Sequence, residues 1–126
     1  MKELKFLQCE TCKKVLLTVI DTAVPTMCCG KPMKVLEPGT TEAAVEKHLP
    51  VATLTGTVLK VEVGEVEHPR TEEHHIAFIT VVYEDGSYAM KELAPTEKPE
   101  ATFISGLKPV SVYAFCNLHG LWKTRL

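Results

Sequence analysis

The chain has 126 residues, of which 45% are apolar, so it can form one medium-sized domain or a small module followed by a larger one. Its net charge of −2 is too small to indicate a nucleic-acid or membrane-surface partner. No segment approaches the run of about 20 apolar residues that a membrane span needs, and residues 1–7 lack the apolar run of a signal peptide. We therefore expect a cytoplasmic protein, whose cysteines bind metal more readily than they pair as disulfides.

The first part of the chain, residues 1–36, is predicted to be a small domain of short strands. Residues 4–7 lead into Cys9, and the β-branched segment 15–20 is typical of a strand. Residues 1–36 hold six Lys and three Asp/Glu (+3), whereas residues 37–126 hold eight Lys/Arg and thirteen Asp/Glu (−5). The two values sum to the total of −2, and their opposite signs indicate two modules.

Four cysteines lie within this first part. Cys9-x-x-Cys12 places two thiols on one tight turn, and the adjacent pair Cys28-Cys29 supplies two more. Four thiolates form a tetrahedral set that suits zinc or iron. A domain of about 36 residues has too small a core to fold without such help. The spacing therefore predicts a metal site, and it leaves the choice between structural zinc and redox iron open.

The second part, residues 37–126, has a β pattern. After a turn-rich linker at 38–41, Thr41 is expected to cap a short helical turn over 42–45. Asp85-Gly86 is a hairpin signal between two strand-like runs. The expected strands number six or seven and include residues 59–63, 76–83, 87–93, 101–104 and 110–115, which predicts an antiparallel β-sandwich.

A second set of metal-binding residue types is spread over this β region. His48 comes just before Leu49-Pro50, His68 precedes Pro69, and His74 follows six residues later. Cys116-x-x-His119 stands at the end of a predicted strand. These are loop or strand-end positions, where a sandwich can bring ligands together at one end. Imidazole and thiolate are ligands of transition metals, so we expect a second centre rich in nitrogen.

Three segments carry a family resemblance over essentially the whole chain. Glu46-Lys47-His48, His68-Pro69 with His74, and Cys116-Asn117-x-His119-Gly120-x-Trp122 resemble the signature of the superoxide reductases. With the four cysteines in front, the chain is similar to the desulfoferrodoxins, the two-iron class of that family. The resemblance implies an all-β protein with a desulforedoxin-like domain at 1–36 and an immunoglobulin-like antiparallel β-sandwich at 37–126. His75 departs from the family, whose members often have an aromatic residue there.

The resemblance also implies two irons and their ligands. Cys9, Cys12, Cys28 and Cys29 would hold an Fe(Cys)4 centre. The second, Fe(His)4Cys centre would reduce superoxide to hydrogen peroxide with one electron. Its ligands would be His48, His68, His74, His119 and Cys116, with Glu46 as a possible sixth ligand when oxidised. Lys47 would attract superoxide, and Asn117 would orient the turn that carries Cys116.

The implied partners are a small electron donor such as rubredoxin and a second copy of the chain. The four-cysteine iron would be a possible electron relay. Two other interpretations remain: a zinc-stabilised structural or binding module, and a simple electron-transfer protein working through the four-cysteine iron. Both account for the four cysteines, but they leave the histidines and Cys116 without a role.

Overall fold

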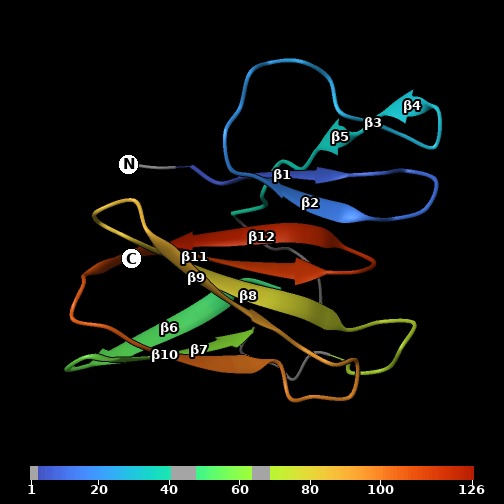
Figure 1. Ribbon diagram of the computed structural model, residues 1–126. Coiled ribbons are helices and arrows are strands. Elements are labelled where there is room, and N and C mark those ends of the chain that lie inside the picture. The colour runs from blue at the N-terminus through green and yellow to red at the C-terminus, as the bar shows by residue number, and fades with distance from the viewer. Residues whose placement is uncertain (1–2, 41–47, 64–68) are drawn as a thin grey trace. The chain divides into compact units, whose positions relative to one another are not determined.

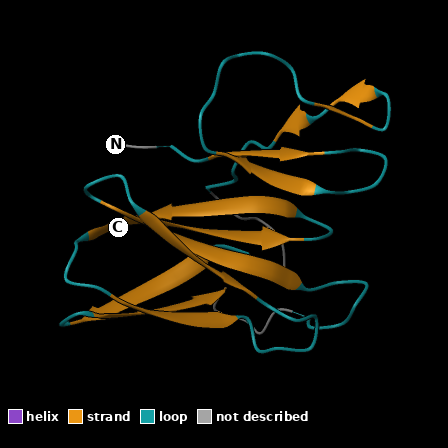
Figure 2. Ribbon diagram, viewed as in Figure 1, coloured by secondary structure: helices purple, strands orange, loops and turns teal. Residues whose placement is uncertain are grey.

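The computed structural model describes residues 3–40, 48–63 and 69–126 (Figure 1). These residues form strands and loops and contain no helix (Figure 2), which confirms the predicted all-β class. Accordingly, the described ranges include no helix that could cross a membrane. The helical turn expected at 42–45 lies outside them. The chain divides into two compact units, one ending at Glu37 and the other beginning at Pro38.

The N-terminal unit is built on a small antiparallel sheet with the strand order β2-β1-β5. Its strands are β1 (Lys5–Gln8), β2 (Val15–Thr18) and β5 (Lys34–Val35), and a separate ribbon pairs β3 (Met27–Cys28) with β4 (Lys31–Pro32). The strand predicted over 15–20 ends at Thr18, because Thr18 pairs with Lys5, the first residue of β1. Val19 and Ile20, 72% and 82% exposed, continue into a loop instead.

The C-terminal unit is a sandwich of two antiparallel sheets, as predicted (Figure 1). One sheet has the order β10-β7-β6, with β6 (Pro50–Thr55), β7 (Val58–Val63) and β10 (Glu100–Ile104). The other has the order β12-β11-β8-β9, with β8 (Ile76–Tyr83), β9 (Tyr88–Glu92), β11 (Pro109–Cys116) and β12 (Gly120–Arg125). Three strands facing four is the immunoglobulin-like arrangement.

The core lies between the two sheets and follows the period-2 pattern of the sequence. Along β7, Leu59, Val61 and Val63 are buried, whereas Lys60 and Glu62 are exposed. Side chains of the facing sheet complete the core, among them Ile79, Val81, Val112 and Ala114. This core gives the unit rigid strands, whose ends can fix the positions of ligands.

Strand pairing decides which loops meet at one end of the sandwich. The β8–β11 ladder places Cys116, the last residue of β11, opposite Ile76, the first residue of β8. The loop that precedes β8 therefore lies beside the turn that follows β11. Thr124 of β12 donates a hydrogen bond from its hydroxyl to the carbonyl of Pro50 (2.7 Å), which holds the start of β6 at β12. Three loops far apart in the sequence are thereby brought together.

Candidate metal centres

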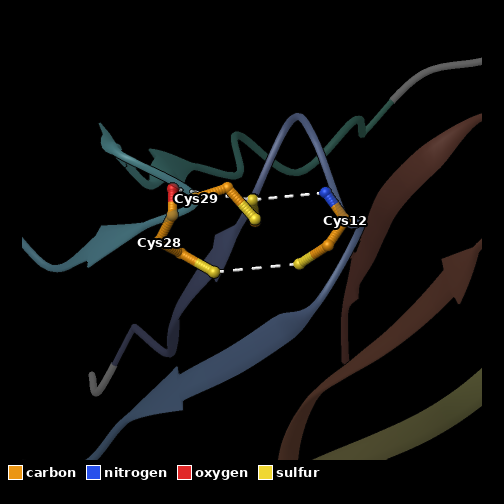
Figure 3. A group of neighbouring side chains, drawn as sticks. Cys12, Cys28 and Cys29 are labelled. Carbon is orange, nitrogen blue, oxygen red and sulfur yellow. Dashed lines mark hydrogen bonds between the residues drawn. The ribbon is translucent and has the colours of Figure 1, made fainter.

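The four cysteines of the N-terminal unit converge from two tight turns. Figure 3 shows three of them, Cys12, Cys28 and Cys29, with their thiols turned toward one site. The first turn closes through two backbone hydrogen bonds, from Cys9 N to Lys14 O (2.9 Å) and from Lys13 N to Cys9 O (3.0 Å). In the second turn Cys29 has a φ of +52° and Gly30 a φ of +76°. Cys29 thus adopts a conformation that few residues with a Cβ occupy, and this conformation directs adjacent thiols to one site.

The sulfur positions fit a tetrahedral metal. All four Sγ atoms lie within 4.8 Å of one another. The Cys12 and Cys28 sulfurs are 3.7 Å apart (Figure 3). Tetrahedral coordination at about 2.3 Å requires a sulfur–sulfur separation of roughly 3.8 Å. The donor set therefore has the size of a tetrahedral iron or zinc site.

One thiol of the group is strongly acidified and two are made less acidic. The backbone N–H of Cys12 donates to Cys9 Sγ (3.4 Å), and this bond lowers the pKa of Cys9 to about 6. Hydrogen bonding with Cys9, and then with Cys12, raises the pKa of Cys28 to about 12. The pKa of Cys29 is raised as well, with the same first cause. A bound cation is what allows all of these thiols to be deprotonated together.

A second group forms at one end of the sandwich from three histidines and one cysteine. The donor atoms of His48, His74, Cys116 and His119 lie within 4.8 Å of one another. His119 Nδ1 is 3.0 Å from His48 Nε2, and Cys116 Sγ is 3.9 Å from His119 Nδ1. His48 and Cys116 are buried, His74 is half-buried and His119 is exposed. The group is thus anchored on the core and open to solvent.

The donor geometry of this group also fits a transition metal. Two neighbouring imidazole ligands at about 2.1 Å from a metal, at a right angle, have nitrogens roughly 3.0 Å apart. The His119–His48 separation matches this value. Three imidazoles and one thiolate make a mixed nitrogen–sulfur set of the kind that iron, copper and zinc accept.

Three further residues predicted for this centre, Glu46, Lys47 and His68, lie outside the described residues. His75 stands apart from the group: its ring Nδ1 is 2.9 Å from the carbonyl of Thr71. The structure thus brings together His74, and not its neighbour, with Cys116 and His119.

Two residues that the sequence analysis did not assign support this centre. Trp122 stacks on the His48 ring, with centroids 5.1 Å apart and planes 15° apart, and its indole N–H donates to the carbonyl of His119 (3.1 Å). Gly39 lies against the indole, where a Cβ would come within 2.7 Å of the ring. Residues 38–41 were interpreted only as a linker, because the sequence holds no signal that pairs Gly39 with Trp122.

The comparison with protein families decides the assignment. The sequence model of the family described as Desulfoferrodoxin matches residues 40–125. This chain belongs to the desulfoferrodoxin family. The desulfoferrodoxin of Syntrophotalea carbinolica is 39% identical over 123 residues, which cover 98% of this chain and 97% of that protein. The desulfoferrodoxin family has two iron sites, and the chain presents one ligand group for each.

Solved structures agree with the family assignment. The crystal structure of the superoxide reductase from Treponema pallidum superposes with a TM-score of 0.83 at 32% identity and covers 98% of both chains. The one-iron superoxide reductase from Giardia intestinalis covers 64% of this chain and 97% of its own, with a TM-score of 0.57 and 30% identity. The desulfoferrodoxin chain thus shares about two thirds of its length with a one-iron protein and nearly all of it with the Treponema protein.

Proposed function

We propose that this protein is a superoxide reductase that works at the histidine–cysteine centre. One superoxide, one electron and two protons give one hydrogen peroxide. The proposal is carried by the convergence of His48, His74, Cys116 and His119 in a chain that is similar to a superoxide reductase over 98% of its length. Composition and fold class alone would support many other functions.

The roles of the described residues follow from their burial and chemistry. Ferrous iron, when bound, supplies the electron that superoxide accepts. Cys116 is fully buried, and its thiolate is the strongest electron donor of the group, as an axial thiolate is in haem enzymes. His48 is buried under Trp122, and His119 is exposed. A small anion reaches the centre from the exposed side.

The roles of Glu46, Lys47 and His68 are proposed from the family resemblance. Residues 37–126 carry eight Lys/Arg against thirteen Asp/Glu, a net charge of −5 that does not attract an anion. The Lys47 ammonium supplies the local attraction and organises a proton-donating water. His68 would supply the fourth imidazole, and the Glu46 carboxylate would be a further ligand of the iron in its oxidised state.

The two parts of the chain divide the work. We assign residues 1–36 as the desulforedoxin-like Fe(Cys)4 domain and residues 37–126 as the catalytic domain. The sequence contains no flavin or nicotinamide fingerprint, and the family resemblance implies a small electron-donor protein such as rubredoxin. Iron held by the four cysteines would supply a redox centre that can relay this electron. None of the five cysteines forms a disulfide, a condition that suits the cytoplasm.

A homodimer is the proposed assembly. The buried apolar side chains among the described residues of the N-terminal unit are few (Leu4, Phe6, Leu7, Cys9 and Met33), while Ile20 and Val24 are 82% and 74% exposed. A unit with so little buried apolar surface gains stability by pairing. Sedimentation equilibrium measures this directly, and a monomer at micromolar concentration would contradict it.

The activity test compares two single substitutions that separate the centres. Cys116→Ser should abolish superoxide reduction and leave the visible spectrum of the four-cysteine iron unchanged. Cys12→Ser should lose that spectrum and keep superoxide reduction with a chemical electron donor. Pulse radiolysis measures the rates, and a peroxide assay gives the stoichiometry.

The stoichiometry distinguishes the proposed reaction from its nearest alternative. A reductase forms one peroxide per superoxide consumed and uses one donor electron each time. A dismutase forms one peroxide per two superoxides and uses none. Full activity of the Cys116→Ser protein, or a peroxide yield of one half without donor consumption, would overturn the proposal.

A further inference from the structure

Asn117 connects two loops at one end of the β8–β11 ladder. These are the loop before β8, which carries His74, and the turn after β11, which carries His119. Its backbone N–H donates to the carbonyl of His75 (3.2 Å), and its side-chain Oδ1 accepts from the backbone N–H of His75 (2.8 Å). Its Nδ2 donates to the carbonyl of Glu73 (3.0 Å) and lies 3.5 Å from that of Glu72. One side chain thus contacts three residues that lie 42–45 positions earlier in the chain.

The pattern of these bonds is that of a β-ladder in which a side chain replaces the backbone. In a hydrogen-bonded pair of an antiparallel ladder, two residues exchange both N–H···O bonds. Asn117 and His75 exchange two such bonds, but the acceptor on Asn117 is its side-chain oxygen. The pairing does not need the backbone carbonyl of Asn117, so the main chain can turn away toward His119 while the pairing continues.

This extension lies where the backbone ladder becomes irregular. The β8–β11 register shifts between Phe115 and Cys116, and the last pair is Cys116 with Ile76. His74 lies beyond that last pair. Within its own loop the His74 backbone N–H lies 3.1 Å from the Thr71 hydroxyl. Both residues that flank His74 in the sequence, Glu73 and His75, are bonded to Asn117.

We propose that Asn117 is a positioning residue that holds His74 against Cys116 and His119 by extending the ladder with its side chain. The sequence led us to expect that Asn117 orients its own turn, whereas in the structure its side chain bonds the opposite loop. The inference rests on the metal centre proposed above. It requires both an acceptor and a donor on one short side chain, a combination that asparagine supplies.

The test uses the full iron-loaded protein and measures iron retention without superoxide. Asn117→Ala should weaken ferrous iron binding at the histidine–cysteine centre about tenfold or more in competition with a ferrous chelator. The red absorption of the four-cysteine iron serves as the internal reference and should not change. Amide hydrogen exchange should show faster exchange at His75 N–H, which loses its acceptor.

A second variant and a matched control keep the result interpretable. Asn117→Asp keeps the acceptor for His75 N–H but loses the donor to the Glu73 carbonyl. Its affinity for ferrous iron should therefore lie between that of the parent protein and that of Asn117→Ala. Asp85→Ala removes a similar bond, from Ser87 N to Asp85 Oδ1 (2.9 Å), beyond the other end of β8. It should lower stability and leave iron binding unchanged.

Two outcomes would overturn the inference: iron retention within twofold of the parent in both Asn117 variants, or an equal loss of iron in Asp85→Ala. If Asn117→Ala does not fold, Asn117→Asp alone decides between these results. A failed superoxide assay would leave this test intact, because iron retention is measured without that substrate.

Discussion

The two metal centres are assembled in different ways. The four cysteines come from 21 consecutive positions, Cys9 to Cys29, on two turns of a unit with a very small core. The histidine–cysteine group draws on residues from His48 to His119, placed by strands of a well-packed sandwich. We therefore expect the N-terminal unit to need its metal in order to fold, whereas the fold of the sandwich positions the ligands of the second metal.

Removal of the metal from the four cysteines should have the largest effect. Structural metal sites of this type contribute on the order of 10–16 kcal/mol to folding, and the few buried apolar side chains of the N-terminal unit cannot replace that. We expect amides of β1 and β2 to lose hydrogen-exchange protection in Cys28→Ser, while β8 and β11 keep theirs.

The matched control for this comparison is Cys116→Ser, which should lose iron from the other centre with protection retained in both units. Persistent protection of β1 in metal-free protein would show that the small unit folds without its metal.

The pH dependence of metal affinity should be steep at the all-sulfur centre. The pKa values of Cys28 and Cys29 are raised above the ordinary thiol value, so both thiols are protonated in the metal-free unit between pH 6 and 8. Each must release a proton on binding. Affinity should therefore rise by about tenfold per proton for each pH unit, or roughly a hundredfold for two. Competition with a zinc chelator across this range measures the slope; a flat profile would contradict the raised pKa values.

Substitution of Gly39 should have a smaller effect, confined to the sandwich. In Gly39→Ala the new Cβ would lie 2.7 Å from two carbons of the Trp122 ring, so the indole must move away from its place on His48. Such overpacking costs about 1–3 kcal/mol of unfolding free energy. Urea unfolding measures it, and the spectrum of the second iron should shift as well.

Gly106→Ala is the control for Gly39→Ala, because a Cβ at Gly106 meets nothing within 4 Å. Equal unfolding curves for the two variants would show that the contact between Gly39 and Trp122 does not contribute to the free energy of unfolding.

Local patterns account for what the sequence could predict. Alternation along residues 59–63 predicted β7, and the Asp85-Gly86 turn predicted the hairpin of β8 and β9. The spacing of Cys9, Cys12, Cys28 and Cys29 predicted a metal group because all four lie on short turns. The strand over 15–20 was placed two residues too long, since its end is decided by where the partner β1 begins.

Long-range contacts account for what the sequence could not predict. β12 (Gly120–Arg125) was not among the expected strands, and its residues Gly120 and Trp122 were named only as part of the family signature. The glycine at position 39 has a clear role only once the structure places it against Trp122. The side chain of Asn117 bonds a loop more than 40 residues away, which no local pattern indicates.

Trp122 is the single tryptophan of the chain, and it contacts the His48 ring and the carbonyl of His119. Near-ultraviolet emission excited at the indole band therefore originates from a ring that contacts two residues of the histidine–cysteine centre. Metal loading at the histidine–cysteine centre should quench this emission. The fluorescence of Trp122 can thus report metal occupancy at the histidine–cysteine centre during assembly, without any added dye.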